Sequence, residues 1–114
     1  MSLDVCLTGE LYGEKIELFG ANYTHNCRPM ATEAGVASVV WFPIENGVTL
    51  AGQVIEPLAK GIALMEADPE RFKALNPKNG WGSYDTFLPW LREYLTACIR
   101  FPKADVWVSR WLML

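Results

Sequence analysis

The sequence predicts an α+β fold. A small antiparallel sheet, built from an N-terminal hairpin and a C-terminal strand, is covered on one face by two long helices and one or two short ones. Apolar residues alternate near both ends of the chain, which is the period of a half-buried strand. Over 50–67 and 83–100 they recur every three or four positions, as in an amphipathic helix. The chain has 114 residues, of which 51% are hydrophobic, so we expect one domain over 1–114.

The first twenty residues are predicted to form the hairpin. Residues 3–8 alternate in hydropathy, the glycine-bounded stretch 9–13 is typical of a loop, and 15–19 alternates again. Residues 20–22 are expected to end the second strand, because glycine and asparagine break strands. The buried face of the hairpin is then expected to carry Val5, Leu7, Ile16 and Leu18.

A short helix is expected over 30–34, because Pro29 suits a first helical position and Gly35 suits a helix end. Residues 36–42 are apolar and β-branched, and periodicity alone does not separate a strand from a buried helix there. We favour a short helix or an irregular buried segment for these residues.

Two long helices are expected to cover the sheet. Thr49 is the predicted N-cap of a helix over 50–67, with a kink at Pro57 and with Gly61 either weakening it or admitting a close neighbour. Ser83 is the predicted N-cap of the last helix, which ends near Arg100.

Between these helices, Asp68 and Pro69 are expected to open a short helix over 70–75, followed by a loop over 76–82 that is rich in turn formers. After Pro102, residues 105–110 alternate as a final strand, expected beside the first or second strand.

The sheet face opposite the helices is expected to be unusually apolar. Such a face suggests the interface of a homodimer. The four apolar residues 111–114 could pack on the domain, enter an interface or stay exposed. The residues expected on this face are Cys6, Thr8, Glu17, Phe19, Trp107 and Trp111.

Composition excludes several classes of function. The net charge of −3 and the pI of about 5.1 argue against general nucleic-acid binding, which needs a basic surface. No apolar window approaches the length of a membrane span, so no membrane association is expected. Three cysteines without a disulfide spacing and an acidic N-terminus without a signal sequence predict a cytoplasmic protein. No motif predicts a cofactor or a metal.

The single histidine, His25, marks the first candidate site, because histidine is the usual general acid or base and Asn22 and Asn26 flank it near a strand end. The simpler interpretation is that these residues cap the following helix and satisfy loop groups. A metal site with Cys27 lacks the paired clusters that zinc needs. A nucleophile pair with Cys27 lacks an identifiable orienting acid.

The loop over 79–85 marks the second candidate. Its glycines and the helix start after it could cradle an anion, and Trp81 could stack on a planar ligand. The simpler interpretation is a structural turn, with Trp81 in the core and Ser83 as cap. The ligand-binding candidates from both segments are Asn22, His25, Asn26, Asn79, Trp81 and Tyr84.

Four segments resemble a group of short proteins encoded in phage and prophage genomes. The resemblance spans 1–111 and implies a genomic context in a bacterial host, but no catalytic residue. The segments that carry it are Ala21–Asn26, Ala67–Pro77, Asn79–Asp85 and Val106–Arg110.

Three functions are compatible with these observations. Because no catalytic constellation is recognisable, we favour a non-enzymatic phage or prophage accessory protein of the host cytoplasm that binds a host protein or a small ligand. The first alternative is a small enzyme with a site between the His25 loop and the Asn79–Asp85 loop, which requires the two loops to converge and His25 to face solvent. The second is a structural or assembly component of a virion.

Overall fold

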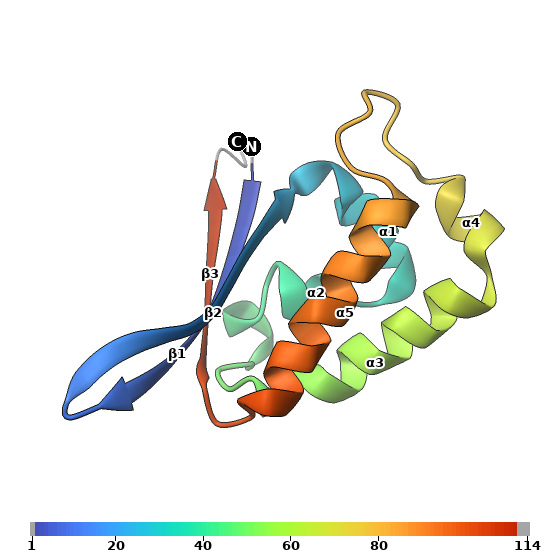
Figure 1. Cartoon of the computed structure of the whole chain (residues 1–114). Coiled ribbons are helices and arrows are strands. Elements are labelled where there is room, and N and C mark those ends of the chain that lie inside the picture. Colours follow the sequence, from blue (N-terminus) through green and yellow to red (C-terminus); the bar gives the residue numbers. More distant parts are fainter. Residues whose placement is uncertain (1, 112–114) are drawn as a thin grey trace.

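In the computed structural model, which describes residues 2–111, three strands form one antiparallel sheet in the order β2-β1-β3. The strands are β1 (Ser2–Leu11), β2 (Glu14–Thr24) and β3 (Asp105–Trp111). All helices lie on one side of this sheet, and the tip of the β1–β2 hairpin projects beyond them (Figure 1). The predicted α+β fold is confirmed, with the C-terminal strand beside the first strand.

The two long helices are α3 (Gly52–Ala67) and α5 (Tyr84–Arg100), which pack against each other. Between residues 2 and 111 they are accompanied by three short α-helices and two 3₁₀ turns, so that residues 36–42 contain a short helix, as favoured. The shorter elements are η1 (His25–Cys27), α1 (Arg28–Ala34), α2 (Ala37–Val40), η2 (Ile44–Asn46) and α4 (Pro69–Lys73).

The hairpin is longer than the sequence predicts. Its turn consists of Tyr12 and Gly13 alone, with φ of 53° and 79°, the two positive values that a tight hairpin turn requires. The expected break at residues 20–22 is wrong, because β2 continues to Thr24 along the whole length of β1. Cross-strand hydrogen bonds there outweigh the weak strand preference of glycine and asparagine.

A register shift in the hairpin changes which side chains face the core. Leu7 pairs with Phe19 but Thr8 pairs with Glu17, so Leu18 is an extra residue. Such a bulge breaks the alternation of faces. Phe19 therefore packs on the core and stacks on Tyr94, with ring centroids 6.1 Å apart, instead of lying on the open face.

Ile16 pairs with Gly9 on the same side of the sheet as Leu7, but its side chain is 39% exposed. The expectation that Ile16 is buried is therefore wrong, because the hairpin tip projects beyond the helices that cover this side (Figure 1). Leu3, Val5 and Leu7 of the central strand are buried, as the alternation predicts for this strand.

Of the N-caps predicted for the two long helices, Ser83 caps its helix and Thr49 does not. The Ser83 hydroxyl accepts from the backbone N–H of Thr86 at 3.3 Å, which confirms this N-cap. Thr49 does not cap α3, because that helix begins at Gly52. Instead the Gln53 Oε1 accepts from the backbone N–H groups of Thr49 and Leu50, both at 2.9 Å.

Arg110 joins the end of β3 to the segment before α3. Its guanidinium donates to the carbonyl oxygen of Trp41 at 2.6 Å and pairs with Glu45 at 2.8 Å. Trp41 is fully buried, so Arg110 holds a core residue in place.

No helix of the described part of the chain is long and apolar enough to cross a membrane. Of the apolar C-terminal run, residues 112–114 lie outside the described residues, and the expectations for them are not addressed.

Candidate ligand-binding site

The end of β2 and the start of α5 meet through Tyr23. The phenolic oxygen of Tyr23 lies 2.7 Å from the Thr86 hydroxyl and accepts from the backbone N–H of Ser83 at 3.2 Å. Its ring stacks on Phe87 of α5, with centroids 5.1 Å apart. The two segments singled out in the sequence, 22–27 and 79–85, are therefore neighbours.

Gly82 permits this close approach. Its φ is +93°, a conformation that favours glycine. A β-carbon at this position would lie 2.8 Å from Cγ2 of Thr24 and 2.9 Å from Sγ of Cys27, both shorter than real contacts. The turn before α5 thus packs directly against the end of β2.

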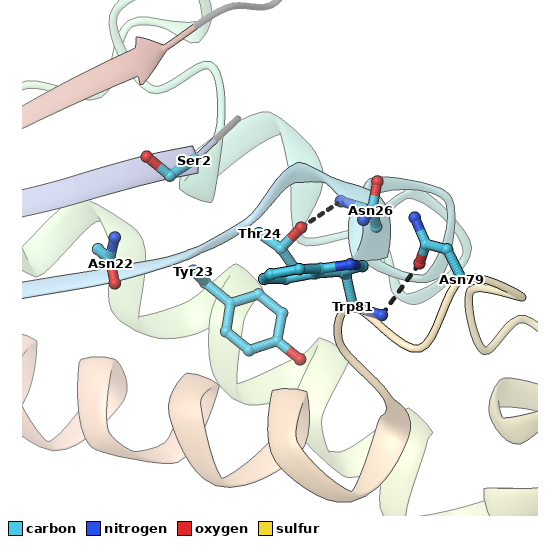
Figure 2. Close-up of a pocket in the computed structure, with 7 residues that line it drawn as sticks. All are labelled: Ser2, Asn22, Tyr23, Thr24, Asn26, Asn79 and Trp81. Carbon is cyan, nitrogen blue, oxygen red and sulfur yellow. Dashed lines mark hydrogen bonds between the residues drawn. The ribbon is translucent and has the colours of Figure 1, made fainter.

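A pocket of about 570 Å³ lies at this junction (Figure 2). Figure 2 shows the indole of Trp81 edge-on, with Asn26 and Asn79 toward one end of it and Ser2 and Asn22 beyond the other. Trp81 is 69% exposed, so the interpretation that it is plugged into the core is wrong. The lining residues are Ser2, Asn22, Tyr23, Thr24, Asn26, Asn79 and Trp81.

Two local hydrogen bonds fix the rim of the pocket. The Asn79 Oδ1 accepts from the backbone N–H of Trp81 at 3.0 Å, and the Thr24 hydroxyl accepts from the backbone N–H of Asn26 at 3.2 Å. Both are turn-type bonds that asparagine and threonine commonly make. The side-chain amides of Asn22 and Asn26 make no hydrogen bond within residues 2–111, so they are available to a ligand.

The described residues that line the pocket are electrically neutral. None of its seven residues carries a formal charge at pH 7, and the only titratable side chain among them is Tyr23. Burial raises the pKa of the Tyr23 phenol above its usual value, although the Thr86 hydrogen bond opposes the shift. The phenol is therefore neutral at physiological pH, and the lining offers hydrogen bonds and an aromatic face.

His25 and Tyr84, the other two candidates from the sequence, do not line this pocket. The Nδ1 of His25 accepts from the indole N–H of Trp41 at 3.0 Å, and the histidine is half-buried. Tyr84 is buried, and its hydroxyl donates to the carbonyl oxygen of Met65 at 2.9 Å. Both side chains make contacts that hold the fold together.

Cys27 has the features of an inert core thiol. It is fully buried, and burial raises the pKa of its thiol above the usual value, which disfavours the nucleophilic thiolate. Among the residues that the structure describes, no three His, Cys, Asp or Glu side chains are grouped as metal ligands would be.

Sequence reasoning missed three lining residues, Ser2, Tyr23 and Thr24. Asn22 and Thr24 are two positions apart on β2 and therefore share one face of the strand. Extending the predicted strand past residue 20 would have placed Thr24 beside Asn22. Ser2 is opposite Thr24 in the sheet, and no local signal marks it.

The fold and the pocket define a small α+β protein with a neutral, aromatic-bearing pocket beside an edge strand. No protein-family model, curated protein or solved structure matches the chain. The resemblance to the phage and prophage group therefore stays a prediction.

Proposed function

We propose that this chain is a small non-enzymatic accessory protein of a phage or prophage, which acts in the host cytoplasm by binding a small neutral ligand in the pocket between the end of β2 and the loop that precedes α5. The observation that carries the proposal is the lining itself. It joins an indole that is 69% exposed to the two unengaged amides of Asn22 and Asn26.

The chemistry of the lining favours binding over catalysis. A general acid or base must reach the substrate and change its protonation near neutral pH. Tyr23 is the only titratable lining residue, its pKa is raised, and its hydroxyl is engaged by Ser83 and Thr86. His25, which the enzyme alternative needs at the pocket, instead accepts from Trp41.

A small ligand also fits better than a flat protein surface. Ligand pockets have volumes of roughly 300–1,000 Å³ and combine an apolar wall with a few polar groups. The pocket of about 570 Å³ lies in this range. A host protein as partner and a homodimer through the open sheet face remain further proposals.

The test is a screen of small neutral compounds against the ¹⁵N-labelled protein by NMR. We expect the bound compounds to shift the indole N–H of Trp81 and the side-chain amides of Asn22 and Asn26, since these groups line the pocket. Trp81→Ala should weaken binding by about fivefold, because it removes a stacking contact of about 1 kcal/mol.

Trp107→Phe is the matched control, because Trp107 is 49% exposed and does not line this pocket. It should leave the affinities unchanged. A screen in which no compound shifts the pocket signals, or in which Trp81→Ala binds as well as the parent chain, would overturn the proposal.

A further inference from the structure

We propose that the ligand of this pocket is a neutral saccharide, recognised through the apolar face of one sugar ring on Trp81. The inference rests on the proposed function and names the chemical class of its ligand. It is drawn from the single aromatic face, the polar rim, the absence of charged lining residues and a second hollow next to the pocket.

Trp81 is the exposed aromatic side chain of the described lining, whereas the ring of Tyr23 is stacked on Phe87 at 5.1 Å and tilted against Trp90 at 5.5 Å between centroids. A pyranose ring has one C–H face for an indole and hydroxyls around its edge, so it matches a single aromatic wall.

The rim matches hydroxyl groups. A sugar hydroxyl both donates and accepts, and so does a carboxamide, through its NH₂ and its carbonyl oxygen. Asn22 and Asn26 keep both functions, while Asn79 keeps its NH₂ because only its oxygen is used by Trp81. The Thr24 hydroxyl accepts from Asn26 and still has a proton to donate.

Charge selects against anionic ligands. A nucleotide or a sugar acid would bring a phosphate or carboxylate to a pocket that no Lys or Arg of residues 2–111 lines. Desolvating an unpaired anion is costly, so such ligands should bind more weakly than neutral ones of the same shape.

A second hollow gives room for a further sugar unit. It has a volume of about 450 Å³ on the open face of β1 and β2, and it shares Asn22 with the pocket. Asp4 and Glu17 line it, and their carboxylates accept hydroxyl protons and repel anions. Gly20 leaves the space open, because a β-carbon there would lie 2.9 Å from the Glu17 carboxylate. An oligosaccharide that spans both hollows should therefore bind more tightly than one sugar unit.

The experiment is an NMR titration of the full chain with neutral methyl glycosides of glucose, galactose, mannose and N-acetylglucosamine, and with their β-linked disaccharides. We expect at least one series to shift the Trp81 indole N–H and the pocket amides, with the disaccharide at least about threefold tighter. Methyl glucuronide should bind more weakly than methyl glucoside, since the two differ chiefly in one carboxylate.

Two substitutions locate the binding. Trp81→Ala should weaken glycoside binding by about fivefold, and its exposed position means that the fold is retained. Asn26→Asp, which keeps the shape but replaces a donor by a negative charge, should also weaken it. Trp107→Phe is the control outside the pocket and should bind as the parent chain does.

Each result decides between the two proposals. Glycoside shifts that disappear in Trp81→Ala support the saccharide. Absence of any glycoside shift up to about 50 mM, with neutral aromatic compounds still binding at Trp81, would overturn the saccharide and leave the proposed function intact. Absence of binding by both kinds of compound would overturn both.

Discussion

At the scale of single residues, the Tyr23 hydroxyl connects the two halves of the candidate site. It lies within hydrogen-bond distance of Thr86 and accepts from Ser83, which itself caps α5. One atom thus couples the end of a strand to the start of a helix more than fifty residues away in the chain. The geometry of the pocket depends on this contact.

Tyr23→Phe should lower the free energy of unfolding by about 1 kcal/mol, because it removes these hydrogen bonds and leaves the Ser83 N–H without its partner. Urea denaturation followed by circular dichroism measures the change. Tyr12→Phe is the matched control, since Tyr12 is 96% exposed in the hairpin turn and should leave stability unchanged. Equal midpoints for the two variants would contradict this account.

His25 illustrates how residue type misleads at this scale. As the only histidine it attracts a catalytic hypothesis, yet its Nδ1 accepts from the buried Trp41 indole. A buried indole N–H costs free energy when it has no acceptor, and the histidine supplies one. Nothing in the local sequence indicates this partner, because Trp41 lies sixteen residues further along.

At the scale of elements, Gly61 sets the distance between α3 and the end of α1. A β-carbon at this position would lie 2.1 Å from Cγ1 of Val36 and 2.9 Å from the carbonyl oxygen of Ala34. Of the two alternatives that the sequence left open for Gly61, close approach of another element is therefore correct.

Gly61→Ala should destabilise the protein by roughly 1–3 kcal/mol through overpacking. The higher helix propensity of alanine returns about 1 kcal/mol, so the net destabilisation should be up to about 2 kcal/mol. Ala63→Gly, an exposed site in the same helix, should cost about 1 kcal/mol for propensity alone. Thermal or urea unfolding measures both, and a stabilised Gly61→Ala variant would contradict the packing argument.

The bulge in the β1–β2 hairpin could not be predicted from the sequence of either strand alone. The alternation predicted two strands correctly, but the extra residue Leu18 places Phe19 on the core side of the sheet, together with Ile16, and not on the open face. A bulge is set by the register between two strands, and no single-strand pattern reports it.

At the scale of the whole molecule, one face of the sheet carries no helix (Figure 1). Trp107 lies on it, 49% exposed, and its indole donates to Thr8 at 2.8 Å. The Lys15 ammonium lies 3.9 Å from the centroid of the same ring. With Phe19 turned into the core, this face has lost one of the apolar side chains that the sequence predicts there, and Trp107 is a described apolar side chain that it offers to a partner.

A substitution of Trp107 therefore tests whether the chain forms a homodimer through this face. We expect light scattering coupled to size exclusion to give twice the chain mass of 12.8 kDa, and Trp107→Lys to give the monomer, because a second ammonium beside Lys15 would be buried unpaired. Asp85→Asn, at an exposed site on α5, is a control that should leave the mass unchanged. A parent chain that is monomeric at all concentrations would exclude the dimer, and a high-order assembly would favour the virion component.

The sequence by itself determined the fold class, the order of the elements and most of the core, because these depend on local periodicity and on capping and turn residues. Val5 and Leu7 are buried, Ser83 caps α5, and the two long helices lie where their apolar spacing places them. Asn22, Asn26, Asn79 and Trp81 could also be singled out, since polar and aromatic residues at element ends are common in binding sites.

Only the tertiary structure decided which of these residues come together. The register of β1 and β2 brings Ser2 beside Thr24, and the close contact at Gly82 and the Tyr23 hydroxyl join residues that are about sixty positions apart. The same packing engages His25 with Trp41 and leaves Trp81 exposed. Such pairings depend on the free energy of contacts across the whole chain, which local patterns do not contain.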